Sequence, residues 1–436
     1  MARTHAVSER VLRVGMLGCG NVGAAVIRLL HEHRDDIQRR AGCHLEVARV
    51  AVRDPAKRRD VPLDASRFVS DPMEVVEDLD VDIVCELIGG NEPAGSLVLA
   101  AFDRDKPVVT ANKELLATRG RELFDASDAK GLDLYFEAAV GGGIPLIRPL
   151  KESLTGERVR RVLGIVNGTT NYILTRMTDD RSSFDDALRE AQRLGYAEAD
   201  PGADVEGHDA AAKCSILASI AFNARVVASD VFREGISRVT TEDIEFARRL
   251  GYVVKLLAIA ELDDTERIAV RVHPAMIPAT HPLASVRDAF NAVFVEGEKV
   301  GELMFYGRGA GGGATATAVV GDLITVARNL VADARGIGCT CFYERTIRPM
   351  VEMTGQYYIL LRVEDRPGVL AEIARVLGDN AVSIKSVWQE GTGRDAQLVF
   401  VTHRAREGAF QHAVAELHAV QAVEEVRSVL RVEAEE

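Results

Sequence analysis

The chain has 436 residues, and at roughly 100–200 residues per domain this length suggests two to four domains. Hydrophobic residues make up 47% and charged residues 27%, which is typical of a globular protein and argues against a disordered or fibrous one. Basic residues number 53 against 66 acidic ones, so the formal net charge is -13 and no nucleic-acid partner is expected.

The chain also lacks the usual marks of a membrane or secreted protein. The longest apolar stretch, residues 317–334, is interrupted by Asp322 and Arg328 and falls short of the ~20 apolar residues of a spanning helix. No apolar stretch precedes the first strand pattern, so we expect no signal peptide and a cytoplasmic location. The six cysteines form no disulfide framework, and Cys339-x-Cys341 lacks a second Cys or His pair for a metal, which favours structural thiols.

From residue 11 to residue 137, short β-branched runs alternate with helical patterns. The runs, in chain order, are VLRVGML, LEVARVAV, VDIVCELI, PVVT and LDLYFEA. Near-continuous apolar runs of this kind predict a parallel sheet that is covered by crossover helices on both faces. Residues 158–177 read as a strand and then a helix, with a hinge at Asn167-Gly168. After residue 355, the pattern is strand, helix, strand, strand, helix, strand, which is typical of a ferredoxin-like domain.

A glycine-rich motif, Gly18-Cys-Gly20-Asn21-Val22-Gly23, lies between the first strand pattern and a helical stretch. In this setting, G-x-G-x-x-G predicts a dinucleotide site, because the glycines permit a tight turn and the helix N-terminus attracts a pyrophosphate. The second strand pattern ends at Val52-Arg53-Asp54. A guanidinium at that place suits the 2′-phosphate of NADP, with Lys57 as a helper, while Asp54 leaves NAD open.

The segment 195–209 holds five carboxylates interrupted by Gly and Pro, and it predicts an acidic loop that attracts an ammonium group. Calcium is excluded because EF-hand spacing fails at Gly202 and Ala211. In the helix that follows, Asp209 and Lys213 are four residues apart and share a face with Ile216 and Ile220. A partly buried Asp–Lys pair is a proton-transfer candidate, and an ordinary helical ion pair is the alternative.

Three shorter segments are also suggestive. Thr110-Ala-Asn-Lys113 follows a strand at the carboxyl end of the predicted sheet, where doubly wound folds bind ligands. Residues 137–145 run from a strand into a glycine turn whose carbonyls can face a cation. Residues 307–313 contain five glycines, which allow either a close backbone approach to a ligand or a flexible loop.

Together, these motifs resemble homoserine dehydrogenases that carry a C-terminal ACT domain. The resemblance rests on GCGNVG, TANKELLA, EAAVGGGIP, GIVNGTTNYIL, GYAEADPGADVEGHDAAAK and YGRGAGG, and on DRPGVL in the last 75 residues. It implies an NAD(P)H-dependent oxidoreductase that reversibly reduces L-aspartate 4-semialdehyde to L-homoserine in threonine and methionine biosynthesis. The implied fold is α/β, with a Rossmann-like nucleotide domain, an α+β catalytic and dimerisation domain and a ferredoxin-like ACT domain. The expected limits are 1–140, completed by about 315–335, then 141–314, a linker over 336–355, and 356–436.

The resemblance also assigns roles to residues. It makes Lys213 the proton donor, oriented by Asp209, and places the substrate against Gly195, Glu198, Asp204 and Lys113. With the residue patterns above, it gives a cofactor site of Gly18, Gly20, Asn21, Val22, Gly23, Arg53, Thr110, Lys113 and Gly311. It implies a monovalent cation, sodium by preference, at Glu137, Val140, Gly142 and Ile144. For the ACT domain it implies an amino-acid effector, threonine most often, at Asp379 and Asn380, and a homodimer or homotetramer.

Two alternatives stay open from the sequence. One is another Rossmann-type amino-acid dehydrogenase, which handles ammonia or an imine. The other is a non-catalytic amino-acid sensor in which the ACT domain is the working part.

Overall fold

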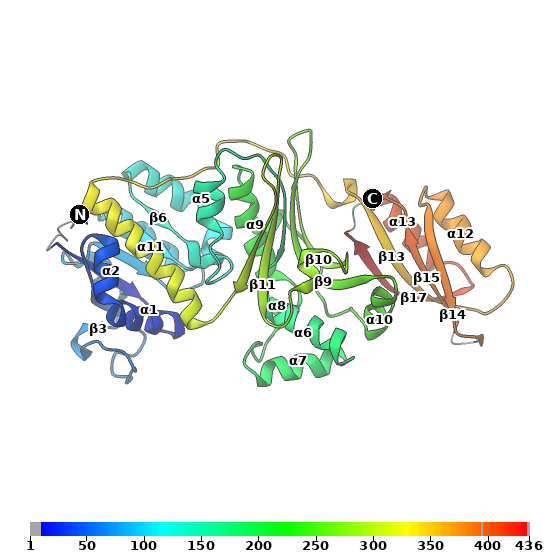
Figure 1. Ribbon diagram of the computed structural model, residues 1–436, viewed down its shortest axis with the longest axis horizontal. Helices are drawn as coiled ribbons and strands as arrows, with labels where there is room; N and C mark the ends of the chain where they lie inside the picture. The colour runs from blue at the N-terminus through cyan, green and yellow to red at the C-terminus, as the bar shows by residue number, and fades with distance from the viewer. Residues whose placement is uncertain (1–9, 394–395, 434–436) are drawn as a thin grey trace, which may run out of the picture. The chain divides into compact units, whose positions relative to one another are not determined.

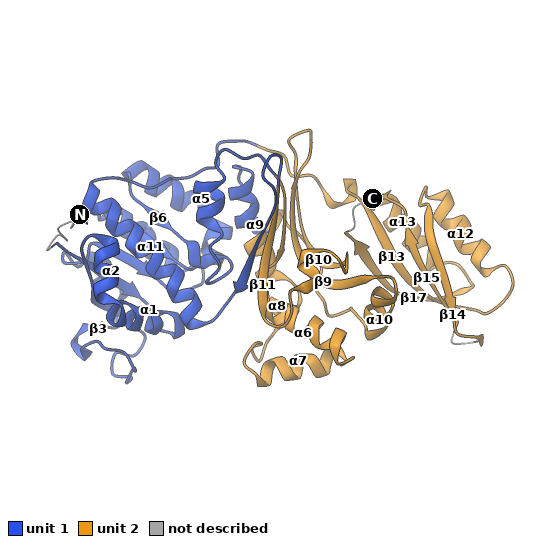
Figure 2. Cartoon of the chain, viewed as in Figure 1, with its two compact units in different colours: residues 1–159, 215–228, 297–344 blue, residues 160–214, 229–296, 345–436 orange. Residues whose placement is uncertain are grey.

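The computed structural model describes residues 10–393 and 396–433. The chain divides into two compact units, coloured blue and orange in Figure 2. The first unit comprises Met1–Val159, Ser215–Ala228 and Gly297–Glu344, and the second comprises Arg160–Cys214, Ser229–Glu296 and Arg345–Glu436. The domain limits expected from the sequence stay a prediction.

The first unit is built on a six-stranded sheet whose described strand pairs are all parallel. In sheet order the strands are β3 (Phe68–Val69), β2 (His44–Ala51), β1 (Val11–Leu17), β4 (Ile83–Glu86), β5 (Val108–Thr110) and β6 (Leu134–Tyr135). The order 3-2-1-4-5-6 is that of the Rossmann fold, and it confirms the parallel sheet predicted from the apolar runs. The sequence order reverses between β1 and β4, where such folds bind their ligands.

Helices cover this sheet. They are α1 (Asn21–Glu32), α2 (Arg34–Ala41), α3 (Pro72–Glu77), α4 (Ala94–Asp103), α5 (Lys113–Lys130) and α11 (Gly312–Ala332). Shorter elements of this unit are η1 (Ala65–Arg67), η2 (Glu137–Ala139), η3 (Pro149–Ser153) and β12 (Gly301–Arg308). In Figure 1, α11 runs beside α1 and α2, although it is about 300 residues later in the chain. Its buried Val319 and Leu323 belong to the same core as Val26 and Leu30 of α1.

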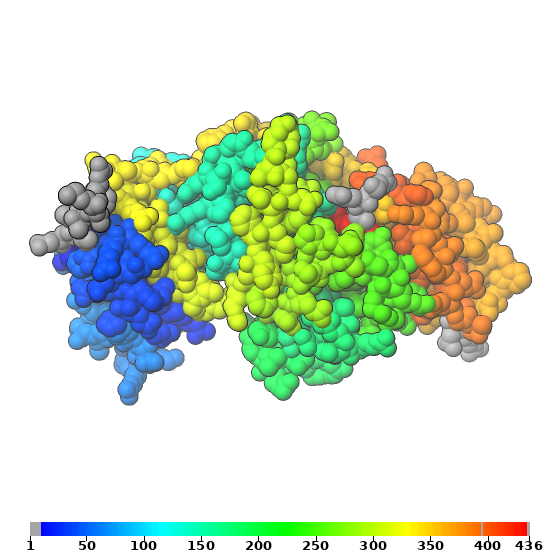
Figure 3. All heavy atoms as spheres, in the orientation of Figure 1, coloured from blue at the N-terminus to red at the C-terminus, as the bar shows by residue number. Residues whose placement is uncertain are grey.

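By length and composition alone, α11 is apolar enough to cross a bilayer. Half of its apolar window is buried inside the protein, and its Asp322 is fully buried against Arg148. Figure 3 shows the yellow atoms of α11 lying directly against blue atoms of the N-terminal segment. The composition of α11 is therefore explained by its place in the core of the first unit.

The second unit holds an extended mixed sheet. Its strands follow one another in the order β11 (Phe290–Gly297), β7 (Val159–Ile165), β9 (Tyr252–Leu262), β10 (Ile268–Pro278), β17 (Val423–Val432), β13 (Thr354–Val363), β15 (Gln397–Thr402) and β14 (Ile384–Glu390). The short strands β8 (Phe232–Arg233) and β16 (Ala405–Arg406) pair with β10 and β13. The helices before residue 300 are α6 (Gly168–Asp179), α7 (Phe184–Arg193), α8 (Gly202–Val205), α9 (His208–Ala221) and α10 (Thr241–Arg249). The chain enters α9 in this unit, and the helix ends in the first unit.

The C-terminal part of the second unit has the predicted ferredoxin-like pattern. The elements run β13, α12 (Val369–Asp379), β14, β15, β16, α13 (Glu407–Leu417) and β17, and all pairs of the four long strands are antiparallel. It has its own core, in which Ile373 and Leu377 of α12 and Phe410 of α13 cover the sheet. β13 begins at Thr354, so the last two residues of the expected linker are strand. The short η6 (Met350–Glu352) precedes it.

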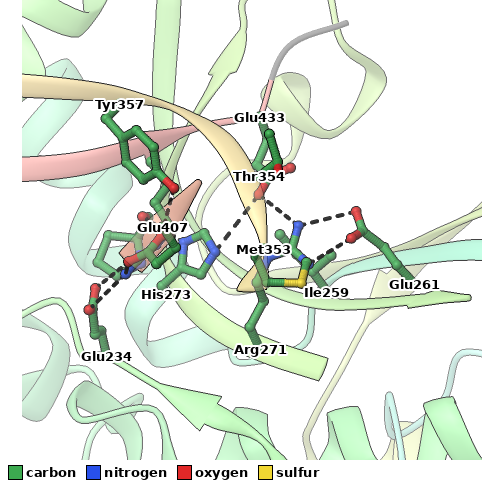
Figure 4. A network of polar contacts seen from close by, with 12 residues as sticks. Glu234, Ile259, Glu261, Arg271, His273, Met353, Thr354, Tyr357, Glu407 and Glu433 are labelled. Atoms are coloured by element: carbon green, nitrogen blue, oxygen red, sulfur yellow. Dashed lines mark hydrogen bonds and ion pairs between the residues drawn. The ribbon is translucent and has the colours of Figure 1, made fainter. Parts of the chain in front are cut away.

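The ferredoxin-like sheet joins the preceding sheet through β17, which pairs in parallel with β10 at Ala275–Arg431 and Met276–Val432. Buried charges gather at this junction, as Figure 4 shows. Arg271 donates to both oxygens of Glu261 at 2.8 and 3.1 Å and to Glu433 at 3.0 Å. Arg431 binds Glu234 and Glu407, and Tyr357 Oη donates to Glu407 at 2.9 Å. We call these residues the junction network.

Candidate active site

The first group of site residues is the Asp209–Lys213 pair on α9. Lys213 Nζ lies 2.7 Å from Asp209 Oδ2, and the two side chains are 11% and 10% exposed, so the pair predicted from the spacing forms. Ile216 and Ile220, on the same helix face, are buried. Lys213 Nζ also donates to the carbonyl oxygen of Val166 at 2.7 Å. An ammonium has three N–H bonds, and no acceptor for the third is found among the described residues.

The second group is organised by Asn167, the N-cap of α6. Its Oδ1 accepts the Thr170 N–H at 2.9 Å, so the amide must turn its NH2 group the other way. Nδ2 then donates to Asp209 Oδ2 at 2.9 Å and to Asp204 Oδ1 at 2.7 Å. Asn167 is only 5% exposed. It therefore ties together two carboxylates that come from different helices.

Sequence reasoning assigned Asn167 only to a hinge and missed this bridging role. An Asn directly before a helical pattern is a signal for the cap. The contact with Asp204 and Asp209 spans 37 and 42 residues, so no local pattern announces it.

Of the predicted substrate residues, Asp204 joins this cluster, and its Oδ2 accepts Thr169 Oγ1 at 3.1 Å. Glu198 is exposed, and Gly195, with φ of +77°, follows the end of α7. The expected acidic loop contains a helical turn, α8, because Asp200 accepts the Gly202 N–H and Pro201 accepts the Asp204 N–H. This turn is what directs Asp204 toward Asn167.

The glycine motif of the first unit forms the turn between β1 and α1. Gly18 has φ of +105°, and its amide donates to Ala51 of β2 at 3.0 Å. A Cβ at Gly23 would lie 2.5 Å from the Gly18 carbonyl oxygen, whereas a Cβ at Gly20 would meet nothing within 4 Å. Gly23 thus permits the close helix–strand packing, and open space over Gly20 fits a pyrophosphate. Asn21 and Val22 begin α1, whose N-terminus has no side-chain cap.

A second helix N-terminus lies beside this turn. Gly311, with φ of +114°, is the N-cap of α11, and a Cβ on Gly312 would lie 3.0 Å from the carbonyl oxygen of Asn21. The amino ends of α1 and α11 therefore meet in the first unit. Two converging helix N-termini favour an anion, as a dinucleotide phosphate requires.

Arg53 lies two residues beyond the end of β2, and it is exposed. The neighbouring Asp54 turns its carboxylate onto the Ala56 N–H at 2.9 Å, so it serves the local turn. Sequence reasoning missed Arg28 and Arg59, whose charges act on the Cys19 thiol inside the glycine motif. Burial nevertheless raises the pKa of Cys19. Arg28 and Arg59 therefore make the surroundings of this turn cationic.

Thr110 lies at the end of β5 with its hydroxyl fully buried. Thr110 Oγ1 donates to Glu86 Oε2 at 2.5 Å, so this hydroxyl has no hydrogen left to donate to a ligand. Glu86, which the sequence did not single out, also accepts the N–H groups of Ile88 and Gly89 at 2.9 and 3.1 Å. Lys113 is half-buried at the first position of α5. Glu86 thus shapes the loop after β4, next to the topological switch point.

The residues of the expected cation site surround the turn after β6. Glu137 accepts three backbone N–H groups, from Leu146, Ile147 and Arg148 at 2.5, 2.9 and 3.0 Å. Gly142 packs so tightly that a Cβ would lie 2.5 Å from the Gly309 carbonyl oxygen. No cluster of three or more His, Cys, Asp or Glu suited to a metal occurs in the described part of the chain. One carboxylate, already stabilised by backbone dipoles, fits a singly charged ion bound mainly by carbonyls.

The expected effector residues lie where α12 ends. Asp379 is its last residue and Asn380 its C-cap. Asn380 Nδ2 donates to Glu416 Oε2 at 2.7 Å, and His412 Nδ1 lies 2.7 Å from Asn380 Oδ1. The side chain of Asn380 therefore joins α12 to α13.

Comparisons with known proteins agree with this geometry. Sequence models described as "Homoserine dehydrogenase, NAD binding domain", "Homoserine dehydrogenase" and "ACT domain" match residues 18–137, 145–324 and 357–422. A homoserine dehydrogenase of Corynebacterium glutamicum is 48% identical over 96% of this chain and 95% of its own length. The chain belongs to the homoserine dehydrogenase family. As a member it is an oxidoreductase with a nicotinamide-dinucleotide domain and a C-terminal ACT domain.

Solved structures place the whole fold in the same family. The homoserine dehydrogenase of Thiobacillus denitrificans has a TM-score of 0.91 and 43% identity, and the match covers 98% of this chain and 99% of that one. A hyperthermophilic archaeal homoserine dehydrogenase, solved in complex with NADPH, has a TM-score of 0.62 and 27% identity over 73% of this chain and 98% of its own. The sensor and the other amino-acid dehydrogenase are therefore not favoured.

Proposed function

We propose that this chain reduces L-aspartate 4-semialdehyde to L-homoserine with NADPH, and that Lys213 donates the proton. The observation that carries the proposal is the third N–H of Lys213, which has no acceptor among the described residues while the other two hold the amine in place. A positioned, protonated amine is what a carbonyl oxygen needs as it gains negative charge.

Bound NADPH supplies a hydride to the carbonyl carbon. The chain's own task is to complete the alcohol by protonating the carbonyl oxygen. Lys213 gives up its third N–H proton to that oxygen, and Asp209 and Val166 hold the amine in the same place before and after transfer. Because the Lys213 side chain is 11% exposed, solvent can restore the proton.

The carboxylates around Lys213 bind the amino end of the substrate. Asp204 and Asp209, both held by Asn167, place two carboxylates together, and Glu198 adds an exposed one nearby in sequence. Carboxylates are the groups that an α-ammonium pairs with. Gly195 and Lys113 complete the substrate contacts in this proposal.

NADPH is the preferred cofactor because Arg53, with Lys57, offers cations where a 2′-phosphate binds. Gly18, Gly20, Asn21, Val22, Gly23, Thr110, Lys113 and Gly311 form the rest of the nucleotide site. Because the Thr110 hydroxyl donates a hydrogen bond to Glu86, Thr110 contacts the nucleotide through its backbone in this proposal. A sodium ion at Glu137, Val140, Gly142 and Ile144 would be structural and takes part in no step.

The ACT domain binds an amino-acid effector, threonine by preference, beside Asp379 and Asn380. ACT ligands of this kind bind at interfaces between such domains, so the active form is a homodimer or homotetramer.

The test is an initial-rate assay on the purified chain. Aspartate 4-semialdehyde with NADPH should give a fall in nicotinamide absorbance, faster than with NADH, and threonine should slow it. Oxidation of NADPH by a 2-oxo acid with ammonium, but not by the semialdehyde, would contradict the proposal in favour of another amino-acid dehydrogenase. Absence of turnover with every pair would contradict it in favour of a sensor.

A further inference from the structure

Cys339 and Cys341 take no part in the proposed reaction, and their surroundings differ from those of the other cysteines. Cys43, Cys85 and Cys214 are buried, and burial raises the pKa of each thiol. Cys339 is half-buried and Cys341 is exposed. Both lie in the first unit, in the segment that follows α11.

The backbone turns at this point and brings the two thiols together. The Cys341 N–H donates to Cys339 Sγ at 3.4 Å, so the sulfur of Cys339 lies against Cys341. The turn is held by Thr340, whose carbonyl accepts the Phe342 N–H at 2.8 Å, and by Asp128, which accepts the Cys339 N–H at 3.3 Å. Two cysteines that share a sulfur hydrogen bond lie within reach of a covalent bond once their side chains rotate.

A buried lysine lies beside the pair. Lys151 of η3 is 8% exposed, and its ammonium donates to the carbonyls of Ile337 and Gly338 at 3.1 and 3.0 Å. It also lies over the rings of Phe124 and Phe136, at 5.8 and 5.5 Å from their centres. Hydrogen bonds from Cys341 lower the pKa of Cys339 to about 6, against the effect of burial, and the charge of Lys151 adds to the lowering. The same interaction raises the pKa of Cys341.

We propose that Cys339 and Cys341 form a reversible dithiol site that hydrogen peroxide oxidises to an intrachain disulfide. Cys339 is the attacking sulfur and Cys341 the resolving one. The assignment follows from the hydrogen bond that the Cys341 N–H donates to the Cys339 sulfur, and from the exposure of Cys341.

The chemistry is that of thiol peroxidation. The Cys339 thiolate attacks one peroxide oxygen, the O–O bond breaks, and the departing hydroxide takes a proton and becomes water, which leaves a sulfenic acid. The sulfur of Cys341 then attacks the Cys339 sulfur, the S–O bond breaks, and the oxygen leaves as a second water with the Cys341 proton. The two thiols lose two electrons and two protons, and one peroxide is reduced to two waters. An added dithiol reverses the step by exchange.

Trypsin digestion separates the Cys339–Cys341 pair from Cys19. Trypsin cleaves after Arg335 and Arg345, so one peptide, residues 336–345, carries both cysteines. The half-buried Cys19 lies on a different peptide, residues 14–28, and burial raises its pKa, which makes it the internal control. The folded protein is treated with peroxide at weakly acidic pH, blocked with N-ethylmaleimide, digested and analysed by mass spectrometry.

We expect peptide 336–345 to be two hydrogen atoms lighter and to bind maleimide only after reduction, while Cys19 is labelled throughout. In Cys341→Ser, Cys339 should stop at the sulfenic acid and react with dimedone. In Cys339→Ser, neither product should form. Lys151→Gln should slow the oxidation of Cys339 several-fold; should this variant not fold, the pH dependence of maleimide labelling of the unaltered chain, with half-maximal rate near pH 6, serves instead.

Three results would overturn the proposal. They are a peptide 336–345 that still takes up two maleimides after peroxide, a disulfide to another residue or another chain, and a Cys339 that reacts no faster than Cys19.

Discussion

Lys213 and Arg271 both pair with carboxylates in the second unit, and they differ in whether the cation can release a proton. Arg271, 6% exposed in its side chain, spends three hydrogen bonds on Glu261 and Glu433, and a guanidinium does not lose its proton in proteins. Lys213 spends two of three N–H bonds and is an amine that can release a proton. The first arrangement ties β9 and β10 to the end of β17, and the second leaves a proton for a ligand.

Substitutions in the junction network should lower the free energy of unfolding, whereas substitutions around Lys213 should lower the rate of the reaction. Glu407 is 2% exposed, and Arg431 and Tyr357 both donate to it. Glu407→Gln removes a buried charge and leaves Arg431 with the half-exposed Glu234, so the free energy of unfolding should fall by about 3 kcal/mol. Denaturant unfolding measures this, with turnover per folded molecule unchanged. The control is Glu425→Gln on β17, the strand that carries Arg431. Glu425 forms an exposed pair with Arg362, and its loss should cost less than about 0.5 kcal/mol. Equal losses in the two variants would contradict the contrast.

His273 is fully buried with its Nε2 3.8 Å from Glu433 of the junction network, and it should make the stability depend on pH. Burial and the charge of Arg431 lower the pKa of His273 from 6.5 to about 4. Between these values the unfolded chain binds a proton that the folded chain does not, so stability is full above pH 6.5 and is lost as the pH falls toward 4. The loss should approach roughly 3 kcal/mol. His273→Gln should flatten this part of the unfolding profile, whereas substitution of the exposed His412 should leave it as it is. An unchanged profile in His273→Gln would contradict the assignment.

A substitution at Asn167 should lower the reaction rate with little loss of stability. Asn167→Ser keeps an N-cap oxygen for α6 and removes the NH2 that holds Asp204 and Asp209, so kcat should fall about tenfold through misplacement of Lys213. Stability should change by less than about 1 kcal/mol. Ser183, which caps α7, is the matched control: Ser183→Ala loses a cap and should keep kcat. If Asn167→Ser lowers stability and kcat only as much as the Ser183 variant does, Asn167 is a cap and nothing more.

The sequence predicts those features that are local. The glycine turn before α1 and the Asp209–Lys213 pair depend on spacings of a few residues, and both form. Asn167 with Asp209, and Arg271 with Glu433, are 42 and 162 residues apart, so only the folded sheet order brings them together. The α8 turn was missed because it depends on one Asx contact, from Asp200 to Gly202.

The role of Lys213 as proton donor is tested by Lys213→Ala, assayed with aspartate 4-semialdehyde and NADPH while NADPH binding is measured separately. Loss of the proton donor should lower kcat at least about a hundredfold, with the dissociation constant for NADPH unchanged. Near-normal turnover in a variant that binds NADPH would show that the proton comes from another group.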